Sequence, residues 1–175
     1  LHIMKERQSL DYITASVLTG AGEYYDEAKP SAVLVHGDTT TTFAAGLAAF
    51  YRGIPVGHVE AGLRSWNMRL PFPEEMNRVL VDKFAAWGFA PTELAAENLR
   101  KEGMAESAIS VTGNTVIDAL FYTVAARTQP DSEELKALPD GAPFVLVPAH
   151  RSESWGAPLD GICAALTDIR VAHPG

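Results

Sequence analysis

Short apolar runs that alternate with longer helical segments are the feature that most restricts the fold of this chain. Expected strands cover residues 32–35, 54–59, 87–90 and 109–111. The expected helices span residues 11–28, 39–51, 73–86, 91–102 and 113–126. Strands that are followed by helices of about 10–15 residues, with short connections, are typical of a parallel sheet. The sequence therefore predicts an α/β fold with a Rossmann-like parallel sheet.

A change in composition divides the chain. Residues 128–142 (TQPDSEELKALPDGA) contain two prolines and a run of acids but few apolar residues, which is typical of a linker. A further apolar strand is expected at 143–147, followed by a helix from about Leu159. We therefore expect an N-terminal domain at 1–127, a linker at 128–142 and the beginning of a second Rossmann-like domain at 143–175. The start at Leu1 and the end directly after an apolar helical run indicate an interior segment of a longer protein.

The composition excludes several kinds of protein. Hydrophobic residues make up 47% of the chain and charged residues 21%, as in an ordinary globular domain. The net charge of −8 argues against a nucleic-acid-binding surface. Cys163 is the only cysteine, so neither a disulfide framework nor a thiolate metal site is expected. No stretch approaches the roughly 20 apolar residues that span a bilayer. We expect a cytoplasmic protein with no nucleic-acid or membrane partner.

Two acidic residues stand at the ends of expected strands. Asp38 follows the first strand, and Glu60 ends the second. The carboxyl ends of parallel strands share one edge of the sheet, where ligands of such folds bind. Asp38 could instead cap the next helix, and Glu60 could simply be exposed at the start of a loop. We favour a site because Gly37 allows a ligand to approach the backbone, and because Gly62 and Arg64 follow Glu60.

The expected helix at 73–86 begins with further polar groups. Glu74 and Glu75 lie in its first turn, where negative charge offsets the helix dipole, and for Glu75 this account suffices. Glu74, Asn77 and Arg78 share one helix face because they are three and four residues apart. These side chains suit a sugar hydroxyl and a phosphate, although an ion pair between Arg78 and Glu74 is the alternative interpretation.

His150 follows the expected strand of the second domain. A lone histidine is more often structural than catalytic, but Arg151 and Glu153 are close to it, and the position would face a cleft between domains. The chain has no GxGxxG fingerprint, Walker A loop or zinc-binding spacing, so no cofactor is indicated. Asp38, Glu60 and Glu74 could together hold a divalent cation, but their spacing does not select for a metal.

Five motifs carry a resemblance to a known family. They are VHGDTTTT, GHVEAGLRS, PFPEEMNR, VTGNTVIDAL and AHRSES. With these motifs the chain resembles the non-hydrolysing UDP-N-acetylglucosamine 2-epimerases over nearly its whole length. The resemblance implies a GT-B-type architecture of two Rossmann-like domains, a homodimer, and interconversion of UDP-N-acetylglucosamine and UDP-N-acetylmannosamine for cell-surface polysaccharides. The family's opening strand with its GTRPE-type loop, and most of the second domain, are missing from this sequence.

The resemblance also assigns roles to residues. Asp38, Glu60, Glu74 and His150 match catalytic or near-catalytic positions, and Arg78 matches a substrate contact. Arg151 and Glu153 are further candidates for substrate binding. The family usually shows H-R-R-E-N where this chain has HRSES at 150–154, so a contact of the second arginine to an anion is in doubt.

The family's chemistry eliminates UDP to give 2-acetamidoglucal and then adds it back, which needs a proton acceptor and a proton donor but no redox cofactor. A GT-B glycosyltransferase is one alternative. A non-catalytic fragment or binding module is the other, since the 175-residue chain alone is expected to lack activity.

Overall fold

The structure is a computed structural model that describes part of the chain. The described residues are 3, 5, 8–126, 132–137, 145, 147–148 and 156–172. The chain separates into two compact units, Leu1–Arg127 and Thr128–Gly175, and each is treated by itself.

The first unit is built on a four-stranded parallel sheet in the order β1-β2-β3-β4. Its strands are β1 (Val33–His36), β2 (Val56–Val59), β3 (Trp87–Ala90) and β4 (Ile109–Val111). The pairing of β1 with β2 places His36 opposite Val59, and the pairing of β3 with β4 places Ala90 opposite Val111. All four strands therefore end at the same edge. The predicted parallel α/β sheet is confirmed.

In the described residues of this unit, one α-helix precedes the strands and four connect or follow them. They are α1 (Leu10–Ala28), α2 (Thr40–Phe50), α3 (Glu74–Phe84), α4 (Glu93–Lys101) and α5 (Thr115–Ala125), with a 3₁₀ turn at Glu106–Ala108. Four of them have an N-cap residue whose side chain accepts a hydrogen bond from a backbone amide in the first turn. These caps are Ser9, Thr39, Thr92 and Asn114. The predicted helices all occur, with bounds that shift slightly at their ends.

One strand is shorter than expected, and the cause is local. Residues 54–59 were expected to be extended, but β2 begins only at Val56. The Ile54 amide donates to Ala49 O, and Pro55 has no amide hydrogen to give to a neighbouring strand.

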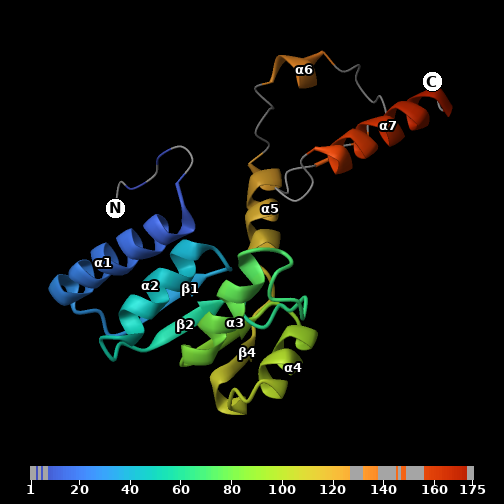
Figure 1. Cartoon of the computed structure of the whole chain (residues 1–175). Helices are drawn as coiled ribbons and strands as arrows, with labels where there is room; N and C mark the ends of the chain where they lie inside the picture. The colour runs from blue at the N-terminus through green and yellow to red at the C-terminus, as the bar shows by residue number, and fades with distance from the viewer. Residues whose placement is uncertain are drawn as a thin grey trace. The chain divides into compact units, whose positions relative to one another are not determined.

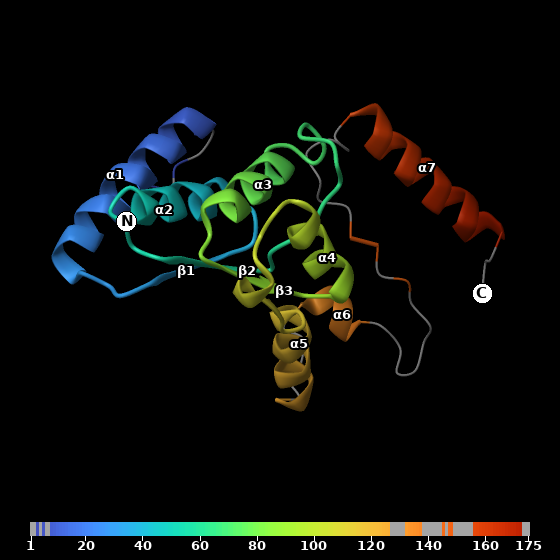
Figure 2. The same cartoon turned by 90° about the horizontal axis from the view of Figure 1, so that it is seen from below.

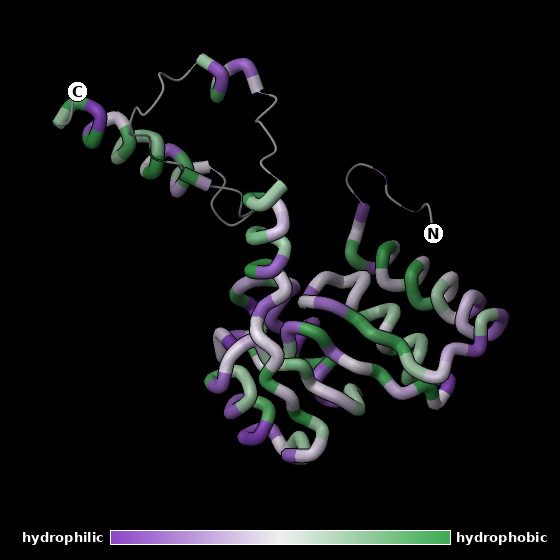
Figure 3. Tube along the Cα trace, turned by 180° about the vertical axis from the view of Figure 1, so that it is seen from behind, coloured by the Kyte–Doolittle hydropathy of each residue, from purple (hydrophilic) through white to green (hydrophobic). Residues whose placement is uncertain are grey.

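Helices α1 to α4 lie on one side of the sheet (Figures 1 and 2). Seen from behind, the strands are nearest to the viewer (Figure 3). Small residues let α2 approach the sheet closely, since Ala44, Ala48 and Ala49 have no exposed surface. On the uncovered side, Leu34 is 66% exposed.

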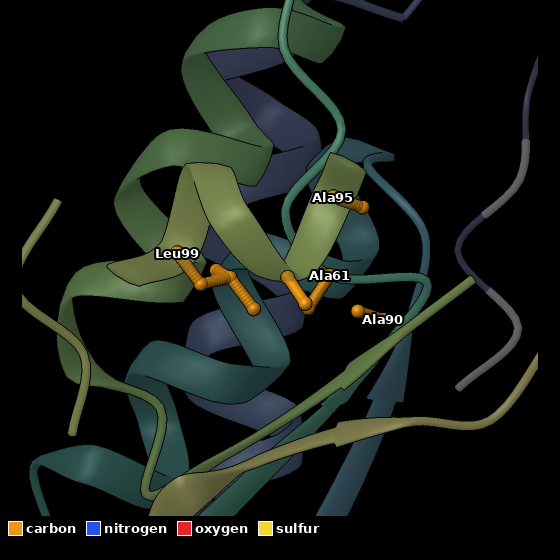
Figure 4. Close-up of a cluster of buried hydrophobic side chains, with 5 residues drawn as sticks. Ala61, Ala90, Ala95 and Leu99 are labelled. Atoms are coloured by element: carbon orange, nitrogen blue, oxygen red, sulfur yellow. The ribbon is translucent and has the colours of Figure 1, made fainter. Parts of the chain in front are cut away.

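Two groups of buried side chains form the core. One joins β1 and β2 to α2 and α3, and its members are Val35, Ala49, Val56 and Val81. The other packs α4 against β3 and the turn after β2 (Figure 4), through Ala61, Ala90, Ala95, Ala96 and Leu99. Because the second group is made mostly of alanine, its backbones lie close together, and an added methyl group has little room.

The described residues of the second unit form two helices, α6 (Glu133–Lys136) and α7 (Ala157–Ala172). Helix α7 corresponds to the helix expected from Leu159. Helix α6, which Ser132 caps, was not expected within the linker. The strand expected at 143–147 lies largely outside the described residues, and the division into an N-terminal domain, linker and second domain stays a prediction. No helix in the described ranges is long and apolar enough to cross a bilayer.

Candidate active site

Polar side chains from three strand ends meet at the carboxyl edge of the sheet. Glu60 Oε2 lies 3.6 Å from His36 Nε2, at the end of β1. Asn114, which follows β4, brings its Nδ2 atom to 3.4 Å from Glu60 Oε1. The Glu60 side chain is 31% exposed, so it is held between these groups but remains open to a ligand.

Glu60 has a left-handed backbone conformation with φ of 70°. For a residue with a Cβ atom this conformation costs about 1–2 kcal/mol. It persists because the amides of Glu60 and Ala61 both donate to Phe89 O, at 3.0 and 3.1 Å. Backbone strain in non-glycine residues is concentrated at functional sites, which supports the assignment of Glu60 to the site.

The residues that follow Glu60 have structural roles instead. Gly62 has φ of 83°, and a Cβ atom there would lie 2.2 Å from Ala95 O. Arg64 has no exposed side-chain surface and is bound to acidic groups behind the sheet edge. The structure therefore removes the support that Gly62 and Arg64 gave to a ligand-binding role of Glu60, because packing accounts for the glycine and buried ion pairs account for the arginine.

Asp38 is not the cap of helix α2. Thr39 caps it, since its hydroxyl accepts from the Thr42 amide. The Asp38 carboxylate points elsewhere and forms an ion pair with Arg78, with Oδ2 2.9 Å from Nη2. Asp38 is 32% exposed and Arg78 12%. A carboxylate and a guanidinium thus lie together on the same edge as Glu60.

The polar residues of helix α3 do not form the one accessible face that the sequence predicts. Asn77 is 1% exposed and donates from Nδ2 to Asp38 O at 2.8 Å, so it supports the turn rather than facing a ligand. Arg78 does not pair with the Glu74 carboxylate. Its Nε atom lies 3.4 Å from the Glu74 carbonyl and 3.4 Å from Glu75 Oε2. The expected Glu74–Asn77–Arg78 face is therefore divided, because only Glu74 and Arg78 remain partly accessible.

Glu74 and Glu75 differ sharply in their surroundings. No hydrogen-bond donor within the described residues reaches Glu74 Oε2, although that atom is buried. Glu74 also lines a pocket of about 350 Å³ with Leu10 and Ile13 of α1 and the start of α2. Within the described residues Glu75 Oε2 is also buried without a hydrogen-bond donor, so it is the pocket that distinguishes Glu74 as a candidate for ligand binding.

Glu75, in contrast, is 1% exposed, and its Oε1 atom accepts from the amides of Ser65 and Trp66 at 2.9 Å each. The helix-dipole account of Glu75 is therefore insufficient, because this carboxylate holds the loop before α3.

A buried charge network behind the edge was missed in the sequence. His58 Nδ1 lies 2.5 Å from Asp82 Oδ1, and Asp82 Oδ2 lies 2.7 Å from Arg64 Nη2. Arg64 Nε continues to Glu102 Oε1 at 2.7 Å. The hydrogen bond from Arg64 lowers the pKa of Glu102. Burial acts to lower the pKa of Arg64, but its bonds to Glu102 and Asp82 outweigh this and raise it. The sequence feature that could have indicated this network is His58, a histidine within the apolar strand β2.

The remaining candidates cannot be placed. His150, Arg151 and Glu153 lie outside the described residues, so their roles stay predictions. Within the described part of the chain, no three His, Cys, Asp or Glu side chains are grouped so that they could hold a metal ion. The suggestion that Asp38, Glu60 and Glu74 share a cation is therefore not supported by their positions.

Comparisons with known proteins point to one family. Residues 1–174 match the protein family described as UDP-N-acetylglucosamine 2-epimerase. The Escherichia coli K12 UDP-N-acetylglucosamine 2-epimerase is 47% identical over 180 residues, which cover 99% of this chain and 48% of that protein. A Clostridium acetobutylicum relative is 50% identical over 170 residues, covering 97% of this chain and 44% of its own length.

Solved structures give the same result. The crystal structure of the Neisseria meningitidis UDP-GlcNAc 2-epimerase bound to UDP-GlcNAc is similar, with a TM-score of 0.90 and 42% sequence identity. The match covers 99% of this chain and 48% of that one. The predicted Rossmann-like α/β fold class is confirmed. The chain spans about half the length of the curated relatives it matches.

Proposed function

The chain belongs to the UDP-N-acetylglucosamine 2-epimerase family, and we propose on this basis that the full-length protein interconverts UDP-N-acetylglucosamine and UDP-N-acetylmannosamine. The observation that best supports this is the sheet edge, where Glu60 lies 3.6 Å from His36 and Asp38 lies 2.9 Å from Arg78. Two carboxylates and a guanidinium beside a strained turn suit proton transfer on an anionic sugar nucleotide.

The substrate chemistry needs such groups. The C2 proton of an N-acetylated sugar is not adjacent to a carbonyl, so its direct removal is unfavourable. Elimination avoids this difficulty. A base takes the C2 proton, a C1–C2 double bond forms, and the C1–O bond breaks with its electron pair leaving on UDP. Addition of UDP to the resulting 2-acetamidoglucal, with a proton delivered to the other face of C2, gives the epimer. The reaction is redox-neutral.

We assign proton transfer to Asp38, Glu60 and Glu74, with His150 contributing from the second domain. Arg78 binds the anionic part of the substrate, and Arg151 and Glu153 bind substrate from the second domain. General acid–base groups of this kind typically contribute about 10²–10⁴-fold to the rate.

The test uses the full-length protein with UDP-N-acetylglucosamine in heavy water, followed by proton NMR. Deuterium should appear at C2 together with the manno epimer. Epimerisation that keeps the original C2 proton, or that depends on added NAD, would exclude the mechanism.

Substitution of the carboxylates makes the test specific. Asp38→Asn, Glu60→Gln and Glu74→Gln should each lower turnover by about 10²-fold or more. Glu97→Gln is the matched control, because Glu97 is 53% exposed and pairs with Lys101 on the surface of α4. Equal effects of the control and the three site variants would argue against the assignment.

Two further parts of the proposal follow from the family. The full-length protein is a cytoplasmic homodimer, and its product supplies activated mannosamine for cell-surface polysaccharides. Light scattering coupled to gel filtration would test the dimer, and loss of a mannosamine-containing polymer on gene deletion would test the role.

A further inference from the structure

The turn that carries Asp38 is held by side chains at every carbonyl. Residues 36–38 join the end of β1 to Thr39, the cap of α2. The regular backbone hydrogen bonds of the strand and the helix do not use the carbonyls of these three residues. Each carbonyl instead accepts a hydrogen bond from a buried side chain of a different element. The bonds are Thr42 Oγ1 to His36 O at 2.7 Å, His58 Nε2 to Gly37 O at 2.8 Å, and Asn77 Nδ2 to Asp38 O at 2.8 Å.

The three donors are well shielded from water. Thr42 is 7% exposed, His58 0% and Asn77 1%. A buried donor that loses its acceptor leaves an unsatisfied polar group, which is unfavourable. Displacement of the turn would break these bonds, so the donors resist it. The Gly37 amide adds a fourth restraint through its bond to Val59 O at 3.0 Å, and φ of 74° at this glycine fits the sharp bend.

His58 is itself fixed from its other side. A carbonyl oxygen can only accept, so Nε2 is the donor to Gly37 O, and Nδ1 faces Asp82 Oδ1 at 2.5 Å. Asp82 cannot swing away, because its Oδ2 atom accepts from Arg64 Nη2 at 2.7 Å and from the Gly62 amide at 3.1 Å. The ring is therefore held between the turn and a buried ion network.

We propose that Thr42, His58 and Asn77 are positioning residues that fix the Asp38 carboxylate, an inference that rests on the proposed function. None of them reaches the reacting atoms. They act through the backbone of the turn, and so their loss lowers turnover by misplacing Asp38 while the substrate still binds. A displacement of about 1 Å at a reacting group costs on the order of 10²-fold in rate.

A pair of substitutions at His58 separates positioning from mere stability. The amide nitrogen of Gln can take the place of ring Nε2 and reach Gly37 O, whereas that of Asn takes the place of Nδ1 and reaches only Asp82. In the full-length enzyme, His58→Gln should keep turnover within about 10-fold of wild type. His58→Asn should lose about 10²-fold in kcat with KM changed less than about threefold. Equal kcat losses in the two variants, or a larger loss for Gln, would overturn the proposal.

Two further variants cover the case in which the His58 variants fold poorly. Thr42→Val keeps the shape of the side chain but removes the hydroxyl donor, and we expect kcat to fall by about 10-fold at unchanged KM. Val56→Ala is the control, since Val56 is 1% exposed, lies on the same strand as His58 and belongs to a buried apolar cluster of the core. Val56→Ala should lower Tm without lowering kcat of the folded enzyme. A loss of kcat in Val56→Ala equal to that in Thr42→Val would show a merely structural effect.

One measurement does not depend on activity. Amide hydrogen exchange at Gly37 and Asp38 should be faster in His58→Asn than in His58→Gln if the ring holds the turn. Equal protection in both variants would overturn the positioning role. If the wild-type protein has no epimerase activity, the proposed function is wrong. The exchange measurement would still decide whether His58 fixes the turn.

Discussion

Arg78 Nη2 lies 2.9 Å from Asp38 Oδ2, so one ion pair joins helix α3 to the turn after β1. Arg78 is 12% exposed, which reduces the screening of this pair by water. The same guanidinium lies 3.4 Å from the buried carboxylate of Glu75. One cation therefore links an acid of the candidate site to an acid that holds a loop.

Replacement of Arg78 tests this link. Arg78→Ala should raise KM, because the guanidinium binds the anionic substrate, and should also lower kcat by about 10-fold, because Asp38 loses its partner. Steady-state kinetics of the full-length enzyme measure both effects. Arg100→Ala is the control, since Arg100 pairs with Glu93 and Glu106 on the protein surface. A change in KM alone would show that the ion pair with Asp38 does not affect turnover.

The strained backbone at Glu60 predicts a conflict between stability and activity. Glu60→Gly relieves a left-handed conformation that costs about 1–2 kcal/mol, so the free energy of unfolding should not fall even though a side chain is lost. Turnover should nevertheless drop by about 10²-fold or more. Glu60→Gln keeps the strain and should show the same loss of turnover at nearly unchanged stability. Chemical denaturation gives the free energies, and a loss of more than about 1 kcal/mol in Glu60→Gly would contradict the strain argument.

Glu74 and Glu75 should respond to substitution in opposite ways. Glu75→Ala removes a buried acceptor of two amide hydrogen bonds. Its free energy of unfolding should fall by about 1.5–3 kcal/mol, the range for hydrogen bonds to charged groups. Glu74→Gln should leave stability almost unchanged and mainly lower turnover. Denaturant-induced unfolding gives the stability of both variants, and initial rates give their turnover. A stability loss in Glu74→Gln equal to that in Glu75→Ala would show that the two glutamates do not have different roles.

Gly62 should tolerate no side chain. Gly62→Ala adds a Cβ atom 2.2 Å from Ala95 O, in addition to the cost of φ at 83°. Gly53→Ala is the matched control, because Gly53 has φ of 66° but no atom within 4 Å of an added Cβ. We expect Gly53→Ala to cost about 1–2 kcal/mol and Gly62→Ala to cost far more, or to prevent folding. Thermal melts that show similar losses for both would mean that the loop can move away from α4.

Glu102 should make the stability of this unit sensitive to acid. Its hydrogen bond from Arg64 lowers its pKa below the ordinary value. A carboxyl whose pKa is lower in the folded state stabilises the fold above its unfolded pKa, and this contribution is lost as pH falls through the folded pKa. Wild-type protein should therefore lose stability below pH about 4.5, the ordinary value for this group.

The variant Glu102→Gln isolates that contribution. It should be less stable than wild type at neutral pH and less dependent on pH below about 4.5, as measured by denaturation across pH. Glu97→Gln is the control, because Glu97 is 53% exposed and water screens its pair with Lys101. An equal flattening of the pH profile in both variants would contradict a special role for the buried pair.

The strands and helices were largely predictable because their signals are local. The apolar run WGFA lies between Ala85-Ala86 and Pro91, and β3 has the bounds that were predicted. The edge at which Asp38 and Glu60 lie also followed from sequence, since parallel strands leave their carboxyl ends on one side. The partners of these acids did not follow. Arg78 pairs with Asp38 across 40 residues of sequence, and no local pattern specifies such a pairing.

The sequence by itself determined the order of strands and helices, the parallel sheet and the candidate acids at its edge. These features depend on hydrophobic periodicity and on the residues that begin and end each element. Only the tertiary structure decided that Thr39 rather than Asp38 caps α2, that Glu75 holds a loop, and that Arg64 is buried with Asp82 and Glu102. These roles depend on distances of a few ångströms between residues far apart in the chain, and packing alone sets such distances.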